Sequence, residues 1–121
     1  MKSGKILFMS RRTSKLLLED ILESAEKILE YTKVMSFEEF SKDNKTIDAV
    51  IRNFEIIGEA SNLLPDDVKD QYPEINWHRI RGFRNRVVHD YFGVDLQIVW
   101  KITNDQIPEL ISGISKILQN Y

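Results

Sequence analysis

The sequence predicts an all-α fold, an antiparallel bundle of four main helices joined by short helical turns. Apolar residues recur at three- and four-residue spacing in its long segments, which is the periodicity of amphipathic helices. No segment shows the sustained two-residue alternation and turn dipeptides that indicate strands. Three prolines and five glycines in 121 residues leave little room for linkers. Because 42% of the residues are hydrophobic, the chain can bury a core, and we expect residues 13–121 to form a single domain.

The first expected helix runs from about Thr13 to Lys33, with Thr13 or Ser14 available as N-cap. Its apolar positions are Leu18, Ile21, Leu22, Ala25, Ile28 and Leu29. Residues 1–12 precede this periodicity and contain several basic residues but no acidic one, so we expect a flexible basic extension there.

A second long helix follows a short one. Ser36 and Glu39 have the spacing of a capping box, which predicts a short helix through Phe40. The second long helix is expected to end at Pro65, because proline cannot continue a helical hydrogen-bond ladder. Its apolar face comprises Ile47, Val50, Ile51, Phe54, Ile57, Ser61 and Leu64.

The last two main helices are each predicted from a cap. After a short turn at residues 67–71 and a break at Pro73, Asn76 can cap a third helix that begins at Trp77. Asp95 can cap a final helix, which we expect Pro108 to kink. The final helix has apolar positions at Leu96, Val99, Trp100, Ile107, Leu110, Ile111, Ile114 and Leu118.

The composition excludes several classes of protein. The chain has no cysteine, and its two histidines are eleven residues apart, which argues against disulfide scaffolds and zinc sites. We therefore expect no metal and no cofactor. Apolar runs are too short for a membrane span, and acidic residues directly follow the first of them, so no signal peptide is expected. These features predict a cytoplasmic protein.

Basic residues are concentrated in one region of an otherwise acidic chain. Five of the 17 basic residues precede residue 16, so the rest of the chain carries 12 of them against 19 acidic residues. No acid lies between Ile75 and Val88, a stretch that carries four arginines. This pattern predicts a local site for anions such as phosphate, lined by Arg79, Arg81, Arg84 and Arg86.

The candidate active site lies in the segment RNRVVHDY, which contains Arg84, Asn85, His89 and Tyr91. Histidine exchanges protons near neutral pH, and arginine offers a planar donor fork suited to phosphate. On a straight helix, however, Arg84 and His89 would point about 140° apart and lie about 7.5 Å apart along the axis. Either the helix ends before His89, or a second copy of the chain completes the site, and Gly82 would permit close approach.

A purely structural interpretation of these residues is also open. An arginine-rich helix face is usually solvated, and a histidine near a helix end often complements the helix dipole. We expect Trp77 and Trp100 to be core or interface anchors and His78 not to be catalytic. The charged stripe on the second long helix is interpreted as surface or dimer rim; it comprises Asp48, Arg52, Glu55, Glu59 and Asn62.

The order of segments nevertheless resembles the HEPN superfamily, and within it the HepT toxins of two-gene HEPN/MNT toxin–antitoxin modules. The resemblance covers LLLEDILESAEKILEYT, MSFEEFSKDNKTIDAVIRNFEIIGEASNLLP and YPEINWHRIRGFRNRVVHDYFGVDLQIVW. The family signature, an arginine, four residues, a histidine, one residue and a tyrosine, maps onto Arg84, His89 and Tyr91. Asn85 matches the polar residue that follows the arginine, and Asp90 stands where many relatives have glycine.

The resemblance implies a HEPN-like helical homodimer with a composite cleft that acts as a metal-independent endoribonuclease. His89 would then transfer protons, Arg84 would hold the phosphate, and Asn85 would support them. Arg79, Arg81 and Arg86 would bind RNA phosphates. It further implies a partner nucleotidyltransferase, the antitoxin, that silences the enzyme by adenylylating Tyr91.

Two other interpretations remain open at this stage. The chain could be a non-catalytic subunit that binds nucleotide or substrate for a minimal nucleotidyltransferase. It could also be an interaction module without a nucleotide ligand, although the four arginines argue against that. His89 discriminates between a nuclease and a binding subunit, because phosphate binding alone does not need it whereas nuclease turnover does.

Overall fold

The computed structural model describes the backbone of residues 2–88 and 95–121 and the side chains of residues 12–83 and 95–121. Within these ranges the chain is all-α and contains no strand, as the sequence predicts. The helices are α1 (Lys2–Thr32), α2 (Phe37–Lys42), α3 (Asn44–Leu63), α4 (Asp66–Asp70), α5 (Trp77–Val88), α6 (Leu96–Asp105) and α7 (Ile107–Leu118).

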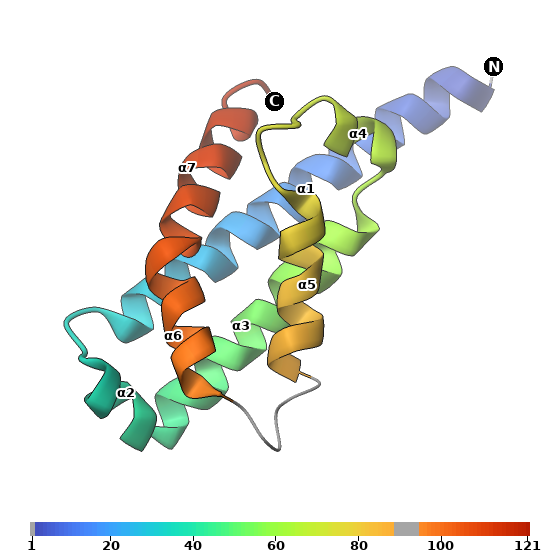
Figure 1. Ribbon diagram of the computed structural model, residues 1–121. Helices are drawn as coiled ribbons and strands as arrows, with labels where there is room; N and C mark the ends of the chain where they lie inside the picture. The colour runs from blue at the N-terminus through green and yellow to red at the C-terminus, as the bar shows by residue number, and fades with distance from the viewer. Residues whose placement is uncertain (1, 89–94) are drawn as a thin grey trace.

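The long helices run alternately up and down the bundle (Figure 1). α1 packs against both α3 and α7, and α5 packs against α3. The order around the bundle is therefore α5, α3, α1 and α7. Since α2 lies against α3 and α6, it covers one end of the bundle.

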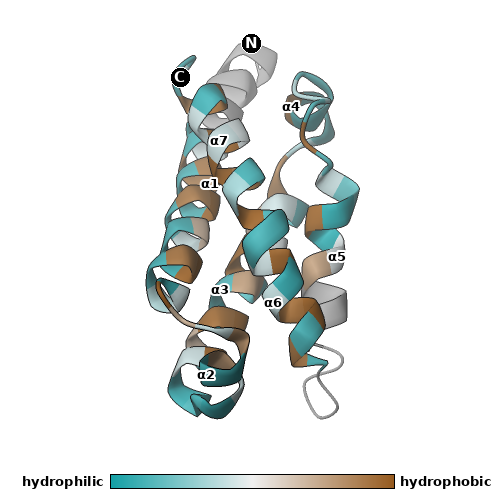
Figure 2. Ribbon diagram, turned by 60° about the vertical axis from the view of Figure 1, so that its left-hand side comes forward, coloured by the Kyte–Doolittle hydropathy of each residue, from teal (hydrophilic) through white to brown (hydrophobic). Residues whose placement is uncertain are grey.

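The core is formed by the apolar stripes that the sequence predicts. Leu18, Ile21 and Ile28 of α1 and Phe54 and Ile57 of α3 have no exposed surface. The apolar residues face the interior of the bundle, and polar residues cover its outer surface (Figure 2). Burying a large aliphatic or aromatic side chain contributes about 1.5–3 kcal/mol, so these contacts dominate the stability of the bundle.

The predicted capping box starts α2. Glu39 N–H donates to Ser36 Oγ at 3.1 Å, and Ser36 N–H donates to Glu39 Oε1 at 2.9 Å. Asp43, which the sequence reading did not single out, caps α3 by accepting from Thr46 N–H at 3.1 Å and from the Thr46 hydroxyl at 2.8 Å. The predicted end of α3 is confirmed, since the helix stops at Leu63, just before Pro65.

Two helix boundaries differ from the predictions. α1 begins at Lys2 rather than near Thr13, because no proline interrupts the earlier residues, and its first turns project beyond the bundle (Figure 1). That residues 1–12 lie outside the folded domain stays a prediction. At the expected kink near Pro108, the single residue Gln106 separates α6 from α7, and its own backbone stays in the αR region. Pro108 lies in the first turn of α7, where its missing N–H costs no helical bond.

Candidate functional site

The helix α5 carries the predicted anion site, and its start is held by three hydrogen bonds. Asn76 caps it as predicted, since Arg79 N–H donates to Asn76 Oδ1 at 3.0 Å. The indole N–H of Trp77 lies 3.2 Å from the carbonyl oxygen of Lys69 and 3.1 Å from that of Tyr72. α4 and the turn after it therefore fix where α5 begins.

The inner face of α5 is held by packing against α3. Ile80 and Phe83 are buried, and the Phe83 ring meets the Phe54 ring edge-on, with centroids 5.5 Å apart and an interplanar angle of 87°. Edge-to-face pairs of this kind add about 0.5–1.5 kcal/mol beyond the area that they bury. The rotation of α5 about its own axis is thereby fixed.

Two of the four predicted phosphate-binding arginines have described side chains. Arg79 and Arg81 are exposed on α5, and no ion pair joins either of them to an acidic residue within the described ranges. Gly82 lies in open space, since a Cβ built there would meet no atom within 4 Å. The surface of α5 at Gly82 is thus open.

The remaining predicted site residues are only partly described. The backbone of Arg84, Asn85 and Arg86 lies within α5, but their side chains lie outside the described residues. His89 and Tyr91 lie outside them altogether. Whether Arg84 and His89 converge, within one chain or across two, therefore stays a prediction.

Other residues considered in the sequence are also described, and the expected core position of Trp77 is confirmed. That His78 is not catalytic stays a prediction. His78 is exposed on the first turn of α5, and Trp77 is buried in the core. Trp100 of α6 packs against two rings from α2, with centroids 6.3 Å from Phe37 and 5.1 Å from Phe40. On α3, Arg52 pairs with Glu55 at 3.4 Å on the exposed charged stripe, as expected of a solvated helix face.

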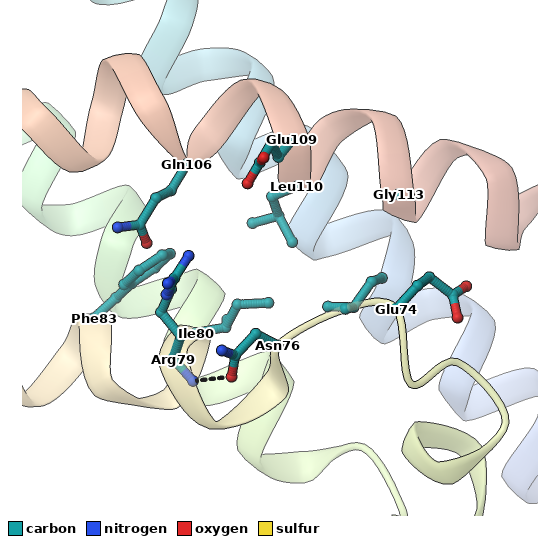
Figure 3. A pocket seen from close by; sticks show the side chains of 10 residues that line it. Glu74, Asn76, Arg79, Ile80, Phe83, Gln106, Glu109, Leu110 and Gly113 are labelled. Atoms are coloured by element: carbon teal, nitrogen blue, oxygen red, sulfur yellow. Dashed lines mark hydrogen bonds between the residues drawn. The ribbon is translucent and has the colours of Figure 1, made fainter.

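A pocket lies beside the arginine helix, and sequence reasoning missed it. Its volume is about 210 Å³, and it opens between the first half of α5 and the junction of α6 with α7 (Figure 3). Arg79 and Phe83 line it from α5, and Gln106 and Glu109 line it from the other side. Pro108 was the only signal in the sequence for this site. The helix is interrupted just before this proline, and Gln106 therefore lies where the two helices separate.

The described residues show no arrangement for a metal ion and no membrane span. No group of three or more histidine or acidic side chains among them could hold a metal. None of their helices is long and apolar enough to cross a bilayer.

An all-α bundle with an arginine-rich helix and an Arg-x₄-His-x-Tyr sequence defines a HEPN-type protein. The family model described as Ribonuclease HepT-like matches residues 21–117. The chain therefore belongs to the HepT-like ribonuclease family, as the sequence resemblance indicated.

Curated relatives agree with this assignment. A protein of Thermococcus cleftensis named probable ribonuclease HepT is 45% identical over 107 residues, which cover 88% of this chain and 97% of the relative. Two proteins of Methanocaldococcus jannaschii that are named as suspected RNases are also similar. One is 38% identical over 93% of both chains. The other is 41% identical over 84% of this chain and 94% of its own length. No solved structure gave a significant match.

Proposed function

We propose that this protein is a metal-independent endoribonuclease, the toxin of a toxin–antitoxin pair that acts in the cytoplasm. The observation that carries the proposal is the family match over residues 21–117, which includes the whole of the Arg84, His89 and Tyr91 signature. The exposed Arg79 and Arg81 on α5 add a surface that can attract the RNA backbone.

The proposed reaction is an attack of a ribose 2′-hydroxyl on the adjacent phosphorus, which breaks the bond to the 5′-oxygen. His89 accepts the proton of the 2′-hydroxyl as general base or donates a proton to the leaving oxygen as general acid. Arg84 offsets the charge that gathers on the phosphate oxygens in the transition state. Asn85, the polar residue that follows Arg84, is assigned a supporting role beside Arg84 and His89. DNA lacks the 2′-hydroxyl nucleophile, so it should not be cleaved.

The active form is proposed to be a homodimer with the site in the cleft between the copies. Gly82 supports this, because its surroundings are open and a second α5 could approach closely there. Light scattering should give twice the 14.2 kDa of one chain. A monomer that still cleaves RNA at micromolar concentration would exclude a composite cleft.

The proposed partner is an MNT-type nucleotidyltransferase that adenylylates the hydroxyl of Tyr91. The added phosphodiester would bring negative charge beside Arg84 and occupy the site by the attraction meant for substrate. Intact-mass spectrometry after incubation with the partner and ATP should show one adenylyl group on the wild type and none on Tyr91→Phe. An adduct that leaves RNA cleavage unchanged would exclude this switch.

The experiment that tests the nuclease itself compares the two histidines of the chain. His89→Ala should lower RNA cleavage by about 10²–10⁴-fold and leave RNA binding nearly unchanged, because the imidazole moves protons and adds little charge. His78→Ala is the matched control, since His78 is the other histidine of the chain and is exposed on α5, and it should retain full activity.

A second pair of variants separates phosphate binding from proton transfer. Arg84→Ala should weaken both binding and cleavage, whereas Arg81→Ala should weaken binding alone. Cleavage by His89→Ala at the wild-type rate, with contaminating nuclease excluded, would favour a non-catalytic subunit that binds nucleotide for a nucleotidyltransferase.

A further inference from the structure

The pocket between α5 and α7 has an apolar floor. Ile80, Phe83 and Leu110 line it and are at most 5% exposed. Ile75 forms one end by resting against Gly113 of α7, where a Cβ would lie 3.2 Å from Ile75 Cγ1. A slot of about 210 Å³ with an aromatic ring in its wall suits a small planar ring rather than a bulky ligand.

One polar atom in this pocket lacks a partner. Oε1 of Gln106 is buried and accepts no hydrogen bond from the described residues. The Gln106 amide extends into the pocket beside the Phe83 ring and the Arg79 guanidinium (Figure 3). A buried acceptor without a donor destabilises the structure around it, so a ligand that supplies a donor at this point is favoured.

The charges at the rim indicate which ligand chemistry fits. Glu74 and Glu109 contribute two carboxylates to the lining, against the single guanidinium of Arg79. This balance disfavours a phosphate inside the pocket and favours a neutral ring that donates hydrogen bonds. Asn76 adds little acceptor capacity, because its Oδ1 already accepts from Arg79 N–H.

We propose that this pocket binds a nucleobase with an exocyclic amino group, from an unpaired nucleotide of the RNA. Sequence-specific RNA recognition uses splayed-out bases that stack on aromatic or guanidinium planes and hydrogen-bond along their edges. A turn of the Gln106 side chain presents its Oε1 to the amino group of the base, while the Arg79 guanidinium contacts the plane of the base above the buried Phe83. Uracil presents a carbonyl oxygen where cytosine presents the amino group, so the pocket discriminates against it.

The pocket and the proposed cleavage point lie on the same helix, and this part of the inference rests on the proposed nuclease function. Arg79 and Arg84 are five residues apart on α5, which separates their Cα atoms by about 7.5 Å along the axis and turns them about 140° apart around it. The pocket would therefore hold a base of the same RNA strand on another face of α5 from the phosphate that Arg84 binds.

Binding of two labelled RNA hexamers, one of cytidines and one of uridines, tests the proposal on a background without cleavage. The hexamers differ at the 4-position of the base, an amino group in cytosine and a carbonyl in uracil, and in the proton that uracil carries on N3, and His89→Ala keeps them intact. The His89→Ala protein should bind the cytidine hexamer at least about fivefold more tightly. Adding Gln106→Leu should bring the two affinities together, and adding Glu109→Ala, at an exposed rim residue, should reduce the preference.

The matched control is Gln119→Leu, the same change at an exposed glutamine after α7, and it should keep the preference. Thermal melting shows whether each variant is folded. If Gln106→Leu does not fold, the Glu109→Ala result decides. Equal affinities for the two hexamers, or a preference that survives both pocket variants, would overturn the base pocket.

Titration with free cytidine and uridine separates this inference from the nuclease proposal. In NMR spectra of the wild type, cytidine should shift the amide signals of Phe83 and Gly113 more than uridine does. Such shifts in a protein that cuts no RNA would overturn the nuclease and keep the pocket. RNA cleavage with no cytidine-specific shift and no base preference would overturn the pocket and keep the nuclease.

Discussion

The two sides of the bundle are built differently. α1 and α3 meet along fully buried apolar residues such as Leu18, Ile21 and Phe54. α5 and α7, which form the other side, are separated by a pocket that contains a glutamine, an arginine and two glutamates. Both sides belong to one core, but the second contains a cavity lined by polar side chains. The α1–α3 side, here called the closed side, contributes stability, and the α5–α7 side, here called the open side, leaves room for a ligand.

The largest expected effect breaks the closed side. Phe54→Ala removes a fully buried ring from α3, together with its edge-on contact to Phe83 of α5. Substitutions of this kind lower the free energy of unfolding by about 3–5 kcal/mol, because the cavity left behind collapses only in part. Urea denaturation measures the loss. A change below about 1 kcal/mol would show that α1 and α3 are less tightly packed than the burial of their side chains implies.

A matched change on the open side should cost less. Leu110 of α7 is buried, but it borders the pocket, so the space left by Leu110→Ala would join a cavity that already exists. We expect a loss near 2 kcal/mol, the lower end for leucine truncation. The same denaturation measurement applies. A loss as large as that of Phe54→Ala would mean that the two sides are equally closed.

This difference also explains which parts of the molecule could be predicted from sequence. The stripes of α1, α3 and α7 and the caps at Ser36, Asn76 and Asp95 are local patterns, and each is confirmed. Helical periodicity and capping residues act within one or two turns, so a single sequence reveals them.

The pocket could not be predicted, because it is formed by segments that are far apart in the chain. Glu74 and Gln106 share no helix and no sequence motif, and they line one cavity only because α5 and α7 do not close against each other. Pro108 predicted a disturbance of the last helix, but not that the break would fall at Gln106. The spacing of Arg84 and His89 gave the candidate catalytic pair, whose geometry depends on tertiary or dimer contacts rather than on spacing.

A smaller effect sharpens the comparison from within the closed side. Ser61 of α3 is fully buried, and its hydroxyl has no hydrogen-bond partner among the described residues. Ser61→Ala should raise the free energy of unfolding by about 1 kcal/mol, because it removes an unsatisfied polar group. Thr32→Val is the control, since the Thr32 hydroxyl donates to the carbonyl oxygen of Ile28 at 2.8 Å. That change should destabilise the protein by about 1 kcal/mol. If both variants changed the free energy of unfolding in the same direction, this interpretation would be contradicted.

The smallest expected effect concerns acid, and it acts on the helix caps at the end of the closed side. The backbone N–H of Ser36 and then its hydroxyl lower the pKa of Glu39 below its ordinary 4.5, and the N–H and hydroxyl of Thr46 lower the pKa of Asp43 below 3.8. Because the folded state favours the carboxylates, they stabilise the protein above these ordinary values. That stabilisation is lost as the pH falls through the lowered pKa of each group. Glu39 is exposed and Asp43 is only half-buried, so the effect is small. Urea denaturation between pH 7 and about pH 3 should show a shallower acid slope for Glu39→Gln and Asp43→Asn than for the wild type. Ser41→Ala is the control, because Ser41 lies on the same helix as Glu39 but does not titrate. It should shift the curve without changing its slope. An unchanged slope in both carboxylate variants would show that these caps do not contribute to acid sensitivity.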